Sequence, residues 1–236
     1  MTVAISSVSK DTVTTAIRLA SARQGIDFNY LLTQAKTESG LDPNAAAATS
    51  SARGLFQFTR GTWLDTIRKH GAEAGLGWAA EAVGKDRDPA VRAAILDLRR
   101  DPTAASAMAA SYAADNAAKL ATGLGRSPTA TDLYLAHFLG PAGAVRFFRA
   151  QAADPAGAAA AVVPTAAKAN PHIFFAPDGT SRSVEAVYDH FAAIFGGKMV
   201  PPKGMSLPPS RPPPLQIAAA PDAARTAYLL LAEMSV

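Results

Sequence analysis

The carboxyl group of Glu38 occupies a position from which it could donate a proton in a reaction. Asp27 is a typical helix N-cap and Gly40 a typical left-handed C-terminal residue, so the sequence predicts a helix between them. Four apolar residues recur there at the helical period and leave Glu38 at the edge of their stripe: Phe28, Leu31, Leu32 and Ala35. Partial burial and the carbonyls of a helix C-terminus both disfavour an ionised carboxylate, and a general acid must be protonated. The alternative is an ordinary solvated glutamate on the surface.

The residues after this helix favour the functional interpretation. The helix ends in Glu38-Ser39-Gly40, a loop of small residues follows, and then come Gly54-Leu55-Phe56-Gln57-Phe58 and Thr62-Trp63. This combination resembles the signature of the soluble lytic transglycosylases, which belong to the goose-type lysozyme superfamily. Their pattern is Glu-Ser, a small-residue loop, Gly-Leu-Met-Gln or Gly-Leu-Phe-Gln, and a following Thr. The resemblance is close over residues 27–63 and extends loosely to about residue 149.

The resemblance implies a fold, a substrate and a mechanism. The fold would be mostly α, of the α+β lysozyme-like (SLT domain) type, and the substrate would be the glycan strands of peptidoglycan. Glu38 would first protonate the leaving oxygen and then act as base on the sugar's own C6 hydroxyl, which leaves a 1,6-anhydromuramoyl end. No metal or other cofactor is implied.

The residues expected to bind the glycan come from the end of this helix, the loop, the turn after it and two later helices. They are Ser39, Thr49, Ser50, Phe56, Gln57, Tyr112, Tyr134 and His137. The side-chain amide of Gln57 can both donate to and accept from a sugar. Ala48 stands where the family usually has Ser, so we expect Thr49 or Ser50 to substitute. Trp63 could stack on a sugar, but its helical spacing with Ile67 favours a place in the core.

A second region departs from the family pattern. The family usually carries Tyr-Asn-Ala-Gly, and alignment on Gly140 puts His137 at the Tyr position and Phe138 at the Asn position. A neutral His137 could hydrogen-bond the Glu38 carboxyl, whereas a protonated one would favour the ionised glutamate and oppose its role as acid. Tyr134 or Tyr112 could provide that support instead, and His137 would then be structural.

Two rival functions stay open. Asp42 is the obvious second acid near Glu38, and a carboxylate that activates water would make the protein a muramidase. An Asp before Pro after a helix is, however, usually a turn residue. The altered Tyr-Asn-Ala-Gly region favours the other rival, an inactive wall-binding component of a secretion, flagellar or phage assembly.

The composition is that of a modestly basic globular protein. The 236 residues are 49% hydrophobic and 18% charged with a net charge of +4, which suits an anionic polymer such as the cell wall. Basic residues are scattered and no nucleic-acid motif is present, so we do not expect nucleic acid as a partner. With no cysteine, disulfides and thiolate chemistry are excluded. We expect a periplasmic or cell-wall location without a membrane span, although no Sec signal is visible and the leader is either missing or replaced by another export route.

Cap residues and prolines divide the rest of the chain. We expect a lysozyme-like domain over residues 1–150, an accessory helical extension over 151–200, and a Pro-rich linker with a short C-terminal helix over 201–236 that could dock onto a cell-envelope machine. The other predicted helices span residues 9–23, 59–69, 89–99, 102–121, 128–138, 155–162 and 183–195. The last of these is amphipathic, and its period places Val184, Val187, Phe191 and Ile194 on the inward face.

Overall fold

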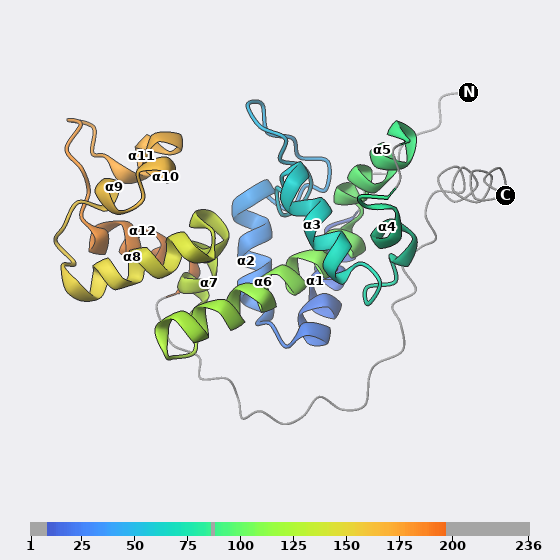
Figure 1. Cartoon of the computed structure of the whole chain (residues 1–236), viewed down its shortest axis with the longest axis horizontal. Helices are drawn as coiled ribbons and strands as arrows, with labels where there is room; N and C mark the ends of the chain where they lie inside the picture. The colour runs from blue at the N-terminus through green and yellow to red at the C-terminus, as the bar shows by residue number, and fades with distance from the viewer. Residues whose placement is uncertain (1–8, 86–87, 197–236) are drawn as a thin grey trace, which may run out of the picture. The chain divides into compact units, whose positions relative to one another are not determined.

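The computed structural model describes residues 9–85 and 88–196, and these are almost entirely helical (Figure 1). Strand pairing within these ranges is limited to isolated antiparallel bridges, so the prediction of a mostly α fold is confirmed. None of the helices there combines the length and apolar character that a bilayer crossing requires. The Pro-rich linker, the C-terminal helix and its docking role lie outside the described residues.

The chain divides into two compact units within helix α6 (Pro102–Leu124). Unit 1 comprises the described residues up to Tyr112, and unit 2 runs from Ala113 to residue 196. The domain boundaries expected near residues 150 and 200 stay predictions.

Unit 1 begins with two helices that pack side by side, α1 (Lys10–Gln24) and α2 (Phe28–Ser39) (Figure 1). Their ends are where the sequence predicts them. The Ser9 hydroxyl caps α1 by accepting from the Thr12 N–H, and the Asp27 carboxylate caps α2 by accepting from the Tyr30 N–H at 2.8 Å. These two caps fix the start of the helix that carries Glu38.

The rest of unit 1 is a cluster of short helices. It contains α3 (Arg60–His70), α4 (Gly77–Ala82), α5 (Pro89–Asp97) and the 3-10 turn η1 (Leu98–Arg100). Trp63 of α3 is fully buried, and its indole N–H donates to the Ile95 carbonyl of α5 at 2.7 Å. The core position expected for Trp63 is therefore confirmed, and it ties α3 to α5.

Unit 2 continues from α6 into six further helices: α7 (Ala130–Leu139), α8 (Pro141–Ala153), α9 (Ala159–Val162), α10 (Pro164–Ala169), α11 (Pro171–Phe174) and α12 (Val184–Phe195). Helix α7 packs against both α8 and α12. The amphipathic helix predicted over 183–195 is present as α12, and three of its four expected inward residues are buried: Val184, Val187 and Phe191. The fourth expectation was wrong, because Ile194 is 41% exposed near the end of the helix.

Two predicted helix starts were also wrong. Helix α7 does not begin at Pro128, because Thr129 and Asp132 form a reciprocal capping box that starts the helix at Ala130. The helix expected from Pro155 is reduced to the single turn α9. Helices α4, α8, α10 and α11 went unpredicted. The last three begin with Pro, but none has a side-chain cap bond before it, and the Asn170 side chain ahead of α11 donates to the Ala166 carbonyl instead.

Candidate active site

Glu38 is half-buried in the last turn of α2. It follows Gln34 by four residues and Ala35 by three, so it continues the buried face of the helix. That face is rotated from the expected one towards Tyr30 and Gln34, both buried. Phe28 and Leu32, expected to point inward, are half-buried instead, and the Arg18 guanidinium lies 4.5 Å from the centre of the Phe28 ring.

The chain turns sharply after Glu38. Gly40 and Leu41 both adopt left-handed backbone conformations, with φ of 63° and 68°, and their N–H groups donate to the Lys36 and Ala35 carbonyls. Asp42 is exposed, and its carboxylate accepts from the Asn44 N–H at 2.8 Å. Asp42 thus has the contact of a turn residue.

Ser39 links the end of α2 to the turn that contains the family-like Gly54-Leu55-Phe56-Gln57 sequence. Its Oγ lies 2.9 Å from the Leu55 carbonyl oxygen and 3.0 Å from the Ala35 carbonyl oxygen, so its single hydroxyl hydrogen is shared between two acceptors. A hydrogen bond therefore connects the residue next to Glu38 to Leu55, sixteen residues further along the chain. Its expected contact with substrate stays a prediction.

The loop between these two segments is folded back on itself. Antiparallel bridges join Ala46 to Arg53 and Arg53 to Phe58, and the Gly54 N–H donates to the Ala45 carbonyl at 2.9 Å. Three short backbone segments, around Ala46, Arg53 and Phe58, thus lie side by side. A loop of small side chains is held in shape by its backbone, because it has little side-chain bulk with which to pack.

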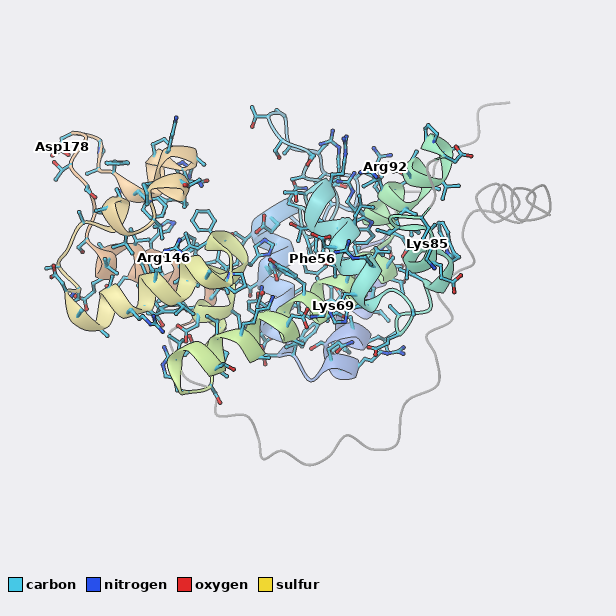
Figure 2. The ribbon with its side chains drawn as sticks, viewed as in Figure 1. Phe56, Lys69, Lys85, Arg92, Arg146 and Asp178 are labelled. Atoms are coloured by element: carbon cyan, nitrogen blue, oxygen red, sulfur yellow. The ribbon has the colours of Figure 1, made fainter. Side chains whose placement is uncertain are left out.

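Gln57 uses part of its side chain to stabilise this loop. Its Nε2 donates to the Gly54 carbonyl at 2.9 Å and to the Ala45 carbonyl at 3.3 Å, and its backbone is left-handed with φ of 45°. Phe56, expected beside it on the glycan groove, is only 1% exposed and packs inside unit 1 (Figure 2). Thr49 and Ser50 are exposed at the far end of the loop.

The three aromatic candidates lie in different settings. Tyr112 is half-buried in unit 1 and meets the Phe58 ring edge-on with centroids 6.2 Å apart. In unit 2, Tyr134 is buried, and His137 is half-buried with its ring centroid 5.8 Å from that of Tyr134. Support of Glu38 by one of these side chains stays a prediction.

Phe138, at the position where the resemblance leads us to expect Asn, belongs to an aromatic cluster of unit 2. Its ring stacks on Tyr134 and on Phe174 of α11, with centroids 6.5 Å and 6.3 Å apart. Phe191 of α12 lies 5.2 Å from it. Helices α11 and α12 therefore pack against this position.

A buried arginine is the feature of the site that sequence reasoning missed. Arg99 is 8% exposed, and its Nη1 donates to the Ser51 carbonyl at 2.7 Å and to the Phe58 carbonyl at 3.1 Å. Burial lowers the pKa of this guanidinium, and the nearby Arg53, Arg60 and Arg100 charges lower it further. In the sequence, Arg99 looks like an ordinary basic residue in a last helical turn, so nothing there signals its burial.

Unit 2 contains a cavity of about 350 Å³ lined by the end of α6 and by α8. None of the predicted site residues lines it; its walls are Gly123, Leu124, Arg126, Phe148, Arg149, Gln151 and Ala152.

A family model described as the transglycosylase SLT domain matches residues 15–136. Because this match covers just over half of the 236 residues, the chain belongs to that family. It therefore carries a lysozyme-like domain of a family that acts on peptidoglycan. The match includes every predicted site residue except His137, which follows its last position by one residue.

Proposed function

We propose that this protein is a peptidoglycan lytic transglycosylase that acts in the periplasm or cell wall, with Glu38 as the only catalytic acid and base. The observation that carries the proposal is the half-buried Glu38 at the end of α2, joined through the neighbouring Ser39 hydroxyl to the Gly54–Gln57 turn. Membership in the SLT family supports the choice of substrate.

The proposed reaction has two steps in which Glu38 changes role. In the first, its carboxyl proton passes to the glycosidic oxygen between N-acetylmuramic acid and N-acetylglucosamine, and the bond from C1 to that oxygen breaks. In the second, the Glu38 carboxylate takes the proton of the muramoyl C6 hydroxyl as that oxygen bonds to C1. The products are a free 4-hydroxyl on one fragment and a 1,6-anhydro end on the other, and Glu38 is again protonated.

The position of Asp42 favours this mechanism over hydrolysis with a second carboxylate. Asp42 is exposed and its carboxylate accepts from the Asn44 N–H, as expected of a group that shapes a turn. A muramidase mechanism would require a carboxylate to hold and activate a water molecule. The D42N variant tests this directly, because the amide keeps an acceptor for the turn and removes the base.

The test is to digest purified sacculi and identify the new ends by mass spectrometry. We expect 1,6-anhydro ends from the wild type and from D42N, and no release of fragments by E38Q, which circular dichroism should show to be folded. Reducing ends from the wild type, lost in D42N, would instead establish a muramidase. A folded wild type that binds sacculi and releases nothing would establish an inactive wall-binding protein.

A further inference from the structure

Four arginines gather around the loop that follows the candidate active-site helix. The arginine cluster consists of Arg53, Arg60, Arg99 and Arg100, all in unit 1. Arg99 is its centre, because its guanidinium lies inside the loop on the Ser51 and Phe58 carbonyls and feels the charges of the other three.

Two further contacts hold members of the cluster at the same place. The Arg60 N–H donates to the Ser51 hydroxyl at 3.1 Å, so α3 begins beside the point where Arg99 enters the loop. Arg53 lies within the loop, and its Nη1 donates to the Ala52 carbonyl at 2.9 Å and to the Ala47 carbonyl at 3.2 Å. These contacts fix the guanidinium groups of Arg53 and Arg99 and the backbone of Arg60.

In the part of unit 1 that the structure describes, acidic side chains offset little of the cluster's positive charge. Among the described residues, Asp97 pairs with Arg100 at 3.1 Å and is the one acidic group that offsets the charge felt by Arg99. The adjacent Asp101 uses its carboxylate to cap α6, accepting from the Ala104 N–H at 2.7 Å. Hydrogen bonds from Arg53 and Arg99 to uncharged carbonyls leave their charge in place. The repulsion between Arg99 and the other three charges opposes folding, and an anionic ligand would reduce that repulsion.

Exposed members of the cluster can reach such a ligand. Arg60 and Arg100 are exposed, whereas the buried Arg99 acts as a positioning residue that fixes the loop. Guanidinium groups bind carboxylates in a planar, bidentate geometry, which an uncharged sugar hydroxyl cannot adopt. The amino-sugar backbone of peptidoglycan is uncharged where its muramoyl groups carry peptides, and those stem peptides bear free carboxylates.

We propose that the arginine cluster binds the carboxylates of the stem peptides, so that the protein prefers glycan strands whose stems are anionic. This inference rests on the proposed function in one respect, namely that the substrate is peptidoglycan. It goes beyond that function by assigning a specificity for the stem to residues outside the catalytic step. The loop that Arg99 enters also carries the Gly54–Gln57 turn, and the Ser39 hydroxyl links that turn to the helix of the candidate acid Glu38.

The test compares sacculi with free stem carboxylates and sacculi whose carboxylates have been converted to amides by carbodiimide coupling. Binding is measured by cosedimentation with the full chain carrying E38Q, which should leave the substrate intact. We expect amidation to weaken binding roughly 3- to 10-fold, as for two solvent-exposed charge pairs. Adding R60Q and R100Q should weaken binding to native sacculi by a similar factor and abolish the difference between the two substrates.

A variant with the same change in charge is the control. Arg92 of α5 and Arg146 of α8, both labelled in Figure 2, are exposed and are not among the four arginines of the cluster. R92Q with R146Q removes two positive charges as well, so a loss caused by net charge alone would appear in both double variants. We expect the control to keep the full preference for native sacculi.

The other possible outcomes distinguish a failure of this inference from a failure of the proposed function. Equal binding to native and amidated sacculi, with anhydro ends still released by the active wild type, would overturn the inference and leave the function standing. A preference for native sacculi by a wild type that cleaves nothing would support the cluster and reject the function. Competition by soluble teichoic acid without any effect of amidation would assign the cluster to phosphate polymers and overturn the inference.

Discussion

The backbone carbonyl of Arg99 occupies the space in which a side chain on residue 54 would begin. A Cβ added to Gly54 would overlap that carbonyl oxygen, and the φ of 78° at Gly54 is one that other residues rarely adopt. This close approach is what lets the Arg99 guanidinium enter the loop and reach the Ser51 carbonyl. The fold alone therefore explains why glycine occupies position 54, without any contact to substrate.

We expect G54A to lower the free energy of unfolding by about 2 kcal/mol or more, because it combines backbone strain with a steric overlap. The matched control is G61A. Gly61 lies in α3 with nothing within 4 Å of an added Cβ, so alanine there should raise stability by up to about 1 kcal/mol. Urea denaturation of both variants measures the difference, and equal effects would contradict the overlap.

Removal of the Ser39 hydroxyl should increase local opening of the loop while the protein stays folded. S39A loses the hydrogen bond to the Leu55 carbonyl, a loss of about 1 kcal/mol. We expect faster hydrogen exchange at the Gly54 and Gln57 amides, which donate within the loop. T37A, on an exposed position of the same helix, serves as the control and should leave those rates unchanged.

At position 57 we expect glycine to give a more stable protein than alanine, the reverse of the order found in helices. Both Q57A and Q57G lose the bonds from Nε2 to the Gly54 and Ala45 carbonyls, but only glycine relieves the left-handed backbone at φ of 45°. We therefore expect Q57G to be more stable than Q57A by about 1 kcal/mol. At Ala93, an exposed helical position in α5, glycine should be less stable than the native alanine by about 1 kcal/mol.

Among the acidic residues described in unit 2, we expect substitution of Asp132 to cause the largest loss of stability. It is fully buried, pairs with Arg126 at 2.5 Å and accepts from the Thr129 N–H at 2.9 Å. D132A leaves both donors without this acceptor, so we expect a loss of about 3 kcal/mol. Asp189 is exposed on α12, and D189A should stay within about 0.5 kcal/mol of the wild type in the same denaturation experiment.

Tyr188 should make unit 2 sensitive to alkali. Burial raises the pKa of its hydroxyl above the ordinary value of 10.0, and the neighbouring Asp132 charge raises it further. The unfolded chain therefore releases this proton at lower pH than the folded one. The stabilising contribution is complete below pH 10 and is lost as the pH rises through the folded pKa. Melting temperatures of wild type and Y188F, compared from about pH 9 to about pH 11, should diverge as this occurs.

The elements that sequence reasoning placed correctly are those with a local signal at both ends. Helix α2 has Asp27 before it and Gly40 after it, and both act as predicted. Unpredicted helices lack that signal. Helix α8 begins at Pro141 after Gly140, which offers no side-chain cap, and α4, α10 and α11 are too short for a hydrophobic period.

The candidate site shows the same limit. Its carboxylate and turn could be found from Glu38, Ser39 and the Gly54–Gln57 sequence, because the family signature is local. The burial of Phe56 and Arg99 depends on contacts between residues that lie far apart in the chain, such as Arg99 with Ser51. A period of two or of 3.6 residues cannot reveal such contacts.

The packing of α12 on α7 has a practical consequence for anyone preparing a shorter version of this protein. The Tyr134 ring stacks on Phe195 with centroids 4.2 Å apart, yet the family match ends at residue 136. A fragment cut at that limit would present bare aromatic rings to water and would tend to precipitate. Expression trials should therefore retain the chain through Phe195.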